Sequence, residues 1–278
     1  MSATWRAEEE PALRRPDARG WLRVLRRGGP MVLLTFGGLA LLLLLRLPER
    51  ALAGARRPLT GRLVQAVCRG NLRLMGLTVA RQGRPMSGGG GLVANHAGWL
   101  DIFVLNAVDR VTFVAKAEVA GWPGIGWLAR ATGTMFVARD PRQAPAQAAA
   151  FAARLRAGER LLLFPEGTSS DGRRVLPFKP TLLAAFFADG LPADVALQPV
   201  SLRYTAPEGA DPRFYGWWGD MALAPHLLQV LAAPRQGTAL VTFHPPLAVA
   251  GFVGRKALAE RAEALVRAGV SGAGREAS

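Results

Sequence analysis

The sequence predicts an α/β fold: a mostly parallel or mixed sheet covered by helices, with an N-terminal membrane-associated helical segment. Three observations predict it. Short apolar runs alternate with longer helical patterns, 278 residues suffice for one main domain with an appendage, and an uncharged stretch lies near the N-terminus. We expect a polar tail over 1–27, membrane-associated helices over 28–78, the main domain over 79–254, and a C-terminal helix and tail over 255–278.

The N-terminal part of the chain combines a polar tail with the most apolar stretch of the sequence. Residues 1–27 are rich in charge and show no pattern, which is typical of a solvated tail. From Gly28 to Leu45, eighteen residues carry no charge, and a helix of that length extends about 27 Å. The apolar core of a bilayer measures roughly 30 Å. Arginines flank both ends, so charge leaves the orientation open, and the segment either spans the membrane or dips into it and returns.

The next stretch, from residue 59 to residue 74, has the pattern of an amphipathic helix. Polar and apolar side chains fall on opposite stripes of a helical wheel: Arg62, Gln65, Arg69 and Arg73 against Leu59, Leu63, Val67 and Leu74. This pattern fits a helix at a membrane interface and, equally, a helix docked on the domain core. The glycine-rich run 87–91 then marks a flexible turn into the main domain.

Within the main domain, strand and helix patterns alternate along the sequence. Strands are predicted at Leu92–Asn95, Val111–Ala115, Thr134–Ala138, Arg160–Phe164, Ala196–Tyr204 and Ala239–His244. Helices are predicted at Gly98–Val108, Pro141–Arg156, Thr181–Ala188 and Ala222–Ala232. Pro199 lies inside one strand and favours an edge or an irregular strand there, because proline donates no ladder hydrogen bond. From about Arg255 the sequence predicts one amphipathic helix and a tail of small residues.

Composition limits the classes of function. Lysine and arginine total 35 against 20 for aspartate and glutamate, a formal charge of +15 that attracts anionic partners. The single Cys68 forms no internal disulfide and excludes a metal site built on cysteines. Gly124–Ala129 fits the dinucleotide fingerprint G-x-G-x-x-A, but no predicted strand precedes it. We therefore expect no metal and no bound cofactor. We also expect no nucleic-acid partner.

The most informative residues are His96 and Asp101, five positions apart, directly after the apolar run 91–94. A general base needs one free imidazole nitrogen, and a carboxylate that binds the other nitrogen fixes the tautomer and stabilises the imidazolium. If residues 92–95 form a strand, His96 lies at its carboxyl end, where open α/β sheets place their chemistry. The pair therefore predicts a general base with its own orienting carboxylate.

Three further patterns end or follow strands of the predicted sheet. Arg139 comes just past the run 133–138, and its planar guanidinium suits phosphate oxygens. The run 164–169 joins the carboxyl group of Glu166, the flexible Gly167 and two hydroxyls. Gln198–Val200 forms the third pattern. Each has a structural alternative: Arg139 can pair with Asp140, and Glu166 can cap a helix.

In this order, the four patterns resemble the glycerolipid acyltransferases typified by 1-acylglycerol-3-phosphate acyltransferase, over residues 70–250. The matching positions are His96 and Asp101 for the H-x4-D pair, Gly133, Phe136 and Arg139 for the second block, Phe164 to Thr168 for the third, and Pro199 for the fourth. The family commonly has Ser or Thr where this chain has Gly98, a departure that we expect to affect stability more than chemistry. The stretch 168–180 also resembles bacterial relatives that acylate lyso-ornithine lipid.

The resemblance implies a membrane-associated O-acyltransferase. His96 takes the proton from a lysolipid hydroxyl as it attacks an acyl thioester, and Asp101 stabilises the imidazolium. Substrate-binding roles fall to Arg139, Glu166, Gly167 and Thr168 at the acceptor head group and to Lys116 near the reacting carbonyl, with Pro199 shaping a channel. Backbone N–H groups near Lys116 or Gly167 are candidates for the oxyanion site.

The implied partners are a lysolipid acceptor, an acyl carrier protein or coenzyme A thioester, and the bilayer, without a further cofactor. The expected acceptor is 1-acylglycerol-3-phosphate, giving phosphatidic acid, and lyso-ornithine lipid is the alternative. Because both donors are cytoplasmic, we expect the site on the cytoplasmic side of a bacterial inner membrane. Two other classes stay open: a metal-dependent phosphoesterase, which needs a third ligand beside His96 and Asp101, and a non-enzymatic basic membrane-binding protein.

Overall fold

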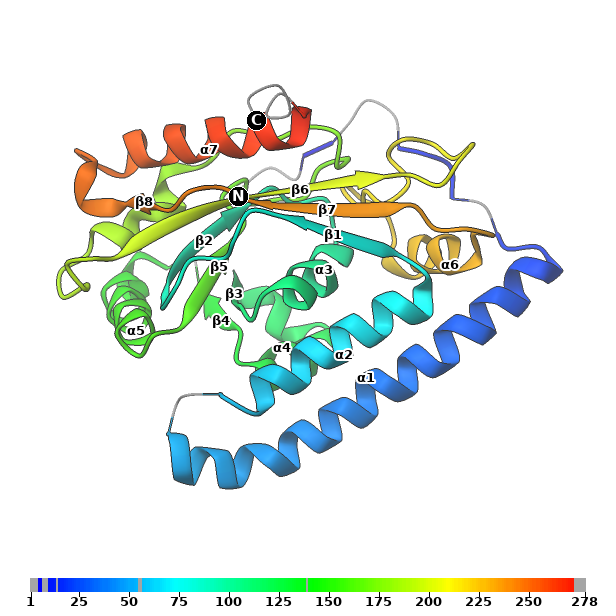
Figure 1. Ribbon diagram of the computed structural model, residues 1–278, viewed down its shortest axis with the longest axis horizontal. Coiled ribbons are helices and arrows are strands. Elements are labelled where there is room, and N and C mark those ends of the chain that lie inside the picture. Colours follow the sequence, from blue (N-terminus) through cyan, green and yellow to red (C-terminus); the bar gives the residue numbers. More distant parts are fainter. Residues whose placement is uncertain (1–4, 7–9, 14, 55–56, 139, 273–278) are drawn as a thin grey trace.

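The computed structural model describes residues 5–6, 10–13, 15–54, 57–138 and 140–272. Their centre is a sheet in the order β1-β7-β6-β2-β5-β3-β4, with β8 paired to β6 (Figure 1). The strands are β1 (Thr78–Gln82), β2 (Gly90–Ala94), β3 (Thr112–Lys116), β4 (Met135–Val137), β5 (Arg160–Leu163), β6 (Ala196–Thr205), β7 (Thr238–Phe243) and β8 (Leu247–Ala248). The pairs β6–β7 and β6–β8 are antiparallel and the other described pairs are parallel. The predicted α/β fold with a mostly parallel, mixed sheet is confirmed.

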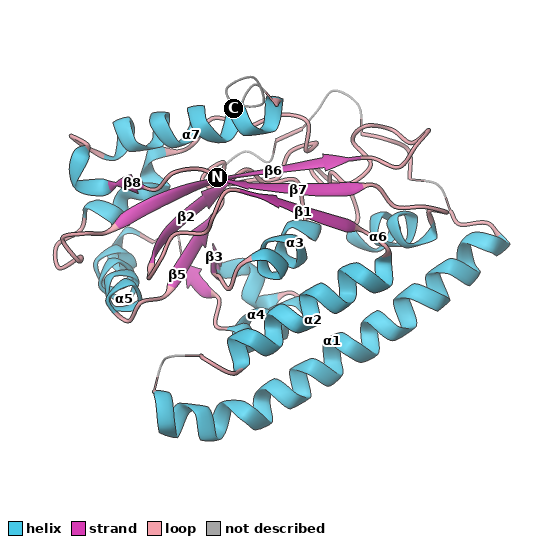
Figure 2. Ribbon diagram, in the orientation of Figure 1, coloured by secondary structure: helices cyan, strands magenta, loops and turns pink. Residues whose placement is uncertain are grey.

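Helices cover both faces of this sheet (Figure 2). They are α1 (Ala18–Ala53), α2 (Thr60–Met75), α3 (Leu100–Val108), α4 (Ile125–Thr132), α5 (Ala144–Arg156), α6 (Leu223–Ala232) and α7 (Arg255–Ser271), with short 3-10 helices η1 (Ala117–Gly121), η2 (Pro141–Gln143), η3 (Pro180–Phe187) and η4 (Val249–Gly251). Side chains from α2, α3 and α6 build one core cluster against the sheet, and those from α5, η3 and α7 build the other. Two apolar layers therefore hold the strands between them.

The strands predicted from the sequence all form, with small shifts at their ends. The edge strand β1 was missed, because most of its side chains are exposed and it lacks an apolar run. The helix α4 and the two-residue strand β8 were missed as well, and the helix predicted at Thr181–Ala188 is the 3-10 helix η3. Short elements with few buried side chains carry little periodic signal.

Of the two alternatives predicted around Pro199, the structure shows the irregular strand and not the edge strand, because β6 lies between β7 and β2. Residues 196–197 of β6 pair with β8 and residues 200–205 pair with β7, so Pro199 falls between the two ladders. Its missing N–H therefore costs no hydrogen bond on that side. The neighbouring Gln198 side chain bonds Met86 N, Arg84 O and His244 O, which ties the irregular point together.

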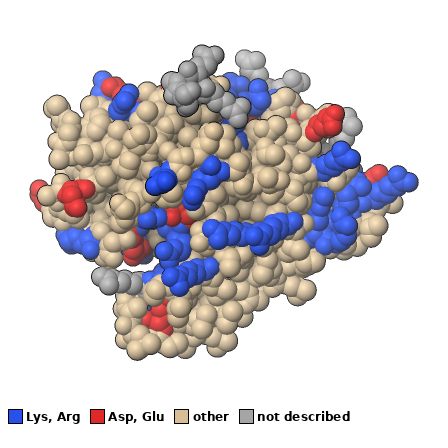
Figure 3. Space-filling model, viewed as in Figure 1, with Lys and Arg blue, Asp and Glu red and all other residues tan. Residues whose placement is uncertain are grey.

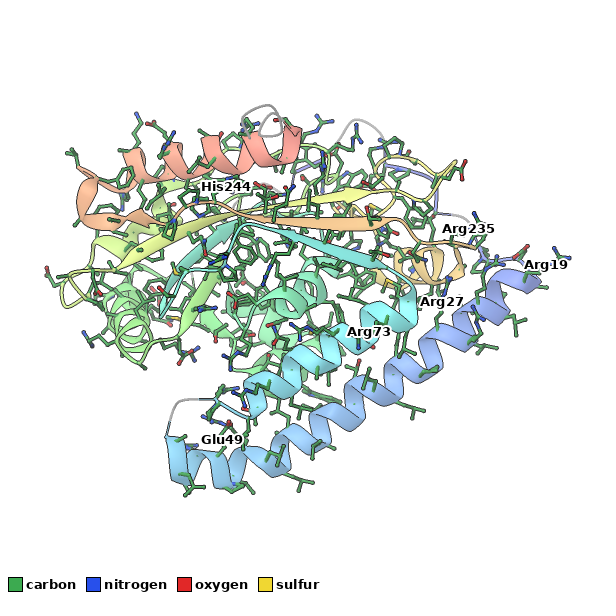
Figure 4. All side chains as sticks on the ribbon, viewed as in Figure 1. Arg19, Arg27, Glu49, Arg73, Arg235 and His244 are labelled. Carbon is green, nitrogen blue, oxygen red and sulfur yellow. The ribbon has the colours of Figure 1, made fainter. Side chains whose placement is uncertain are left out.

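The polar tail predicted over 1–27 is shorter than expected, since α1 begins at Ala18 with Asp17 as its N-cap. The physical reason lies in α6. Arg27 is buried and donates to Leu231 O and Ala233 O, at 2.9 and 2.6 Å, and Arg23 donates to Ala232 O. These guanidinium groups cap the carbonyl end of α6, where cations are favoured. Figure 4 shows Arg27 on α1 beside this end.

Helices α1 and α2 form an antiparallel hairpin along the lower side of the domain (Figure 1). Gly38 and Gly70 allow close approach, because a Cβ there meets Val67 or Leu34 at 2.6 Å. Buried Glu49 accepts hydrogen bonds from the N–H groups that begin α2 (Figure 4). Of the two interpretations of the amphipathic stretch, the structure shows a helix docked on the core, since α2 packs against both α1 and α3.

The outward face of α1 is apolar. By length and composition α1 is suited to cross a membrane, and only 11% of its most apolar 18-residue window is buried within the protein. Exposed arginines mark the end where α1 begins, and the long face of α1 beyond them is almost without charge (Figure 3). Those that Figure 4 labels are Arg19, Arg73 and Arg235. The helix supports membrane association. Helix α1 begins ten residues before the boundary predicted at 28, and the boundaries at 79 and 255 stay predictions.

Candidate active site

Four neighbouring strands carry the candidate residues to one edge of the sheet. Strands β2, β5, β3 and β4 are adjacent and mutually parallel, so their carboxyl ends form a row. His96 lies two residues beyond β2, the run 164–168 follows β5, and Lys116 ends β3. Arg139, predicted to follow β4, lies outside the described residues. The carboxyl edge of a parallel sheet is where such folds bind ligands.

His96 and Asp101 form the predicted pair. The Nδ1 atom of His96 lies 2.6 Å from Oδ2 of Asp101. The carboxylate can only accept, so Nδ1 carries the proton and Nε2 keeps its lone pair. The Asp101 side chain is fully buried and the His96 side chain is 22% exposed. The pair therefore presents a basic nitrogen on a partly exposed ring, while the Asp101 carboxylate is shielded from solvent.

The Asp101 carboxylate is held from several directions. Its Oδ2 atom also accepts from the backbone N–H groups of Ala97, at 2.7 Å, and Gly98, at 3.0 Å. Its Oδ1 atom accepts from the Tyr204 hydroxyl at 2.8 Å. Asp101 also lies in the first turn of α3, where the helix dipole favours a negative charge. Four donors and the dipole offset the cost of burying the charge.

The His96 ring is fixed by stacking as well as by hydrogen bonding. It lies against Phe164 with ring centroids 4.0 Å apart and planes inclined by 16°, and Phe164 stacks in turn on Phe113 of β3. The backbone is pinned too, since Ser170 N donates to His96 O at 2.8 Å. These contacts come from β3 and from the turn after β5, so neighbouring strands set the orientation of the imidazole.

Glu166 is buried beneath the turn that carries His96. Its Oε1 accepts from His96 N at 3.4 Å, and its Oε2 has no hydrogen-bond partner among the described residues. Burial raises the pKa of Glu166 to about 9, with the charge of Asp101 adding to the shift and backbone N–H groups of His96 and Leu176 opposing it. At neutral pH this carboxyl group is uncharged and faces the protein interior.

The remaining predicted site residues differ in accessibility. Lys116 is exposed at the end of β3, and Thr168 is partly buried in the turn after β5. We call the part of the carboxyl edge that carries Lys116 and Thr168 the rim of the site. The N–H of Gly167 donates to Phe164 O at 3.0 Å, so this one group is engaged within the turn, and the N–H groups near Lys116 and Gly167 stay a prediction for the oxyanion site. The positive φ of Gly167, 69°, favours glycine at this turn. A Cβ there also lies 2.9 Å from the Nζ atom of Lys179.

A segment that sequence reasoning missed closes one side of the site. Trp217 N donates to Ala97 O at 2.7 Å, and a Cβ at Gly98 lies 2.8 Å from the Cβ of Trp217. The Trp99 indole N–H donates to Nδ1 of His226, whose Nε2 faces Phe214 O. Burial lowers the pKa of His226 to about 4, so this histidine is neutral and its two hydrogen bonds hold the segment in place.

The N-terminal tail reaches the same rim. Trp5 N lies 3.4 Å from the Thr168 hydroxyl, and the Trp5 ring packs between Trp218 and the Arg174 guanidinium. Arg6 pairs with Asp220 at 3.1 Å. The described part of the tail therefore docks on the domain, contrary to the expectation of a solvated tail. Its polar composition gave no signal for these long-range contacts.

A third histidine, His244, lies under α7 and apart from the His96–Asp101 pair. Its N–H donates to Pro199 O, and its ring bonds the Ser201 hydroxyl, which also contacts Val266 O of α7. Within the described residues, no three His, Cys, Asp or Glu side chains are grouped as metal ligands. The phosphoesterase alternative therefore lacks its third ligand in this part of the chain.

Fold and site together define a class: an α/β protein with a His–Asp pair at the carboxyl edge of its sheet and a long apolar helix beside it. Residues 77–203 match the acyltransferase family model. The chain is 55% identical over 266 residues to a lyso-ornithine lipid O-acyltransferase of Rhodobacter capsulatus, covering 96% of each chain. It is 33% identical to a 1-acyl-sn-glycerol-3-phosphate acyltransferase of Neisseria gonorrhoeae, over 76% of this chain and 81% of the relative.

A solved structure shares the fold. The 1-acyl-sn-glycerophosphate acyltransferase of Thermotoga maritima superposes with a TM-score of 0.64 at 21% identity, covering 94% of this chain and 98% of that one. The chain belongs to the acyltransferase family, as the sequence resemblance indicated, and it is an O-acyltransferase of lysolipids.

Proposed function

We propose that this enzyme transfers a fatty acyl group from a thioester to the hydroxyl of a lyso-ornithine lipid, with His96 as the general base, at the cytoplasmic side of a bacterial inner membrane. The 2.6 Å contact between a buried carboxylate and a partly exposed imidazole carries the proposal. The acceptor follows from similarity: the relative with 55% identity along nearly the whole chain bears that name, whereas the glycerophosphate relative is 33% identical.

The proposed reaction is direct transfer. Nε2 of His96 takes the hydroxyl proton as the acceptor oxygen bonds to the thioester carbon, and Asp101 stabilises the imidazolium. The tetrahedral intermediate then collapses, the carbon–sulfur bond breaks, and the departing thiolate takes the proton from Nε2. His96 returns to its starting state and no covalent enzyme intermediate forms. Cys68 is no rival nucleophile, because it is buried and its pKa is raised to about 12.

The other predicted site residues take different roles in this proposal. Lys116 and Thr168 at the rim, with Arg139, are the candidates for the acceptor head group and the reacting carbonyl. Gly167 shapes the turn that carries Thr168. Glu166, at 1% exposure, acts through the His96 backbone rather than by direct contact with the head group. This arrangement separates the groups that meet substrate from those that hold the base.

A competition assay tests acceptor and base together. The full chain, purified in detergent, receives equal concentrations of lyso-ornithine lipid and 1-acylglycerol-3-phosphate, with acyl carrier protein or coenzyme A thioester in parallel arms. The ratio of products equals the ratio of kcat/KM for the two acceptors. We expect lyso-ornithine lipid to be preferred, and His96→Ala to lower kcat by about 10²–10⁴-fold.

His244→Gln is the matched control, because this histidine bonds Ser201 beneath α7, makes no contact with the His96–Asp101 pair, and should leave the rate unchanged. Preference for the phosphate-bearing acceptor contradicts the proposed substrate and restores the glycerophosphate assignment. A fully active His96→Ala variant contradicts the proposed base, whichever acceptor is preferred.

A further inference from the structure

The catalytic carboxylate is contacted from a second, distant strand. Oδ2 of Asp101 faces His96 and two backbone N–H groups, whereas Oδ1 accepts a hydrogen bond of 2.8 Å from the Tyr204 hydroxyl. The two residues are 103 positions apart in the sequence. Both are buried, with Tyr204 at 7% exposure and Asp101 at 0%. A hydrogen bond to a charged group in a dry environment is stronger than one in water.

Asn95, the residue before His96, fixes the position of β6 and hence of Tyr204. Its amide nitrogen donates to Leu202 O and its amide oxygen accepts from Leu202 N, both at 2.8 Å. This two-bond bridge sets β6 against the catalytic turn two residues before Tyr204. The Tyr204 ring then packs against Tyr215 at 5.3 Å in the core. The contact with Asp101 is therefore built into both the strand and the turn.

The direction of this hydrogen bond is fixed by chemistry. Burial raises the pKa of Tyr204 well above 10, and the neighbouring Asp101 charge raises it further. The phenol therefore keeps its proton wherever the enzyme works, and it donates while the carboxylate accepts. A donor on Oδ1 draws negative charge away from Oδ2, the atom that binds His96.

We propose that Tyr204 is a positioning residue for the base: it holds the Asp101 carboxylate by its outer oxygen and moderates the charge that this carboxylate presents to His96. The inference rests on the proposed role of His96. Tyr204 does not touch the substrate in this scheme. It sets how readily the imidazole accepts and then releases the proton during acyl transfer, because a base held too strongly as imidazolium returns its proton slowly.

The sign of the effect follows from the surroundings of Asp101. The titratable groups that face it are His96, Tyr204 and Glu166, and Glu166 is neutral below its pKa of about 9. Beyond them lie Tyr215, behind Tyr204, and the neutral His226, reached through Trp99. Loss of the Tyr204 hydroxyl concentrates charge on Oδ2. Proton binding by the His96–Asp101 pair then becomes tighter, and the acid limb of the rate profile moves to higher pH.

Tyr204→Phe is the direct test, measured as kcat/KM against pH with either acceptor. We expect kcat to fall about tenfold, as for the loss of a hydrogen bond to a charged group. The acid limb should rise by about one pH unit, and the KM for both substrates should stay the same. The matched control is Tyr215→Phe, which removes the hydroxyl of the neighbouring buried tyrosine, a group that bonds Gln236 and Gly237 instead. It should leave the acid limb in place.

A second measurement works even where Tyr204→Phe fails to fold. The chain contains 2 tyrosines, Tyr204 and Tyr215. When cells that produce the Tyr215→Phe variant grow on 3-fluorotyrosine, the label therefore enters position 204 alone. The electron-withdrawing fluorine strengthens the phenol as a donor, so the acid limb should move to lower pH, opposite to Tyr204→Phe. The fluorine resonance should titrate at the midpoint of that limb and lose this titration in His96→Ala.

These outcomes separate the two proposals. A folded Tyr204→Phe enzyme with an unshifted acid limb, or a fluorine resonance that stays constant across that limb, overturns the role of Tyr204. An active His96→Ala enzyme instead overturns the proposed base itself. If the acid limb moves to higher pH in Tyr204→Phe and to lower pH in the protein with 3-fluorotyrosine at position 204, the results support Tyr204 as the residue that tunes the base.

Discussion

Two turns meet beside the His96 imidazole, and each carries a buried carboxyl group. The turn after β2 leads to Asp101, and the turn after β5 carries Glu166; the two residues are 0% and 1% exposed. Asp101 accepts four hydrogen bonds, from His96, Ala97, Gly98 and Tyr204. Glu166 has one oxygen bonded to backbone and one without a partner among the described atoms. The two carboxyl groups are therefore buried to the same extent but differ strongly in their hydrogen-bond partners.

Hydrogen-bond donors, rather than depth of burial, distinguish these two acids. Glu166 has its pKa raised to about 9 by burial, so it is neutral at pH 7. Asp101 is surrounded by donors that favour its charged form. One turn therefore supplies a charge for the imidazolium and the other supplies a neutral frame for the backbone. The proposed mechanism uses this asymmetry, and each of the following substitutions tests one side of it.

Asp101→Asn should have the largest effect. The asparagine keeps the shape and accepts hydrogen bonds with its oxygen, but it removes the charge that stabilises the imidazolium. We expect kcat to fall by about 10³–10⁴-fold, measured by thioester consumption, with the melting temperature little changed. The control is Asp109→Asn at the other end of α3, which breaks the ion pair with Arg160 and costs stability instead of turnover. Activity within tenfold of wild type in Asp101→Asn contradicts the role of the charge.

Glu166→Gln should have a small effect on activity and a pH-dependent effect on stability. The amide copies the neutral acid, so kcat should change by less than about tenfold at pH 7. The folded-state pKa is raised to about 9, whereas an unfolded glutamate titrates near 4.3. Between these values the folded protein binds more protons, so wild type loses stability as pH rises, by about 1.4 kcal/mol per unit from this group.

The glutamine variant lacks this loss. The melting temperature of Glu166→Gln minus that of wild type should therefore be larger at pH 8 than at pH 6. Glu260→Gln, an exposed partner of Lys256 on α7, should show no such trend. A pH-independent difference between Glu166→Gln and wild type indicates that Glu166 is charged in the folded protein, and the contrast with Asp101 then fails.

The contact between His96 and Asp101 was predictable from sequence because its geometry is local. His96 and Asp101 are joined by one turn between a strand and a helix, and both elements carry clear apolar patterns. Tyr204 was not predictable in the same way, since a tyrosine in an apolar strand reads as core and its partner lies 103 residues away. The sequence placed Glu166 in the right turn, but its burial depends on packing around the turn.

The N-terminal region shows the same limit. Its arginines indicated a solvated tail, but Arg27 is buried because the carbonyl end of α6 lies within its reach. Trp5 docks through Trp218 and Arg174, which no local pattern connects to it. Apolar periodicity revealed most of the sheet, whereas polar residues that pair across the fold became visible only with the structure.

Gly98→Ala should have the smallest effect and tests how the first turn is held. A Cβ at this position lies 2.8 Å from Trp217 Cβ and 3.2 Å from Trp217 N, so side-chain truncation at Trp217 does not make room and the segment itself has to shift. That shift strains the bond from Trp217 N to Ala97 O and the bond from Gly98 N to Asp101. We expect a loss of about 1–3 kcal/mol in the free energy of unfolding.

The control for this substitution is Gly121→Ala at the end of η1, where a Cβ meets nothing within 4 Å. Its stability should equal or exceed that of wild type, because alanine restricts the unfolded chain more than glycine does. Similar melting temperatures for the two alanine variants contradict a tight contact between Gly98 and Trp217. A selective loss in Gly98→Ala, with kcat reduced far less than in Asp101→Asn, shows that the segment supports the turn while the charge of Asp101 supports the chemistry.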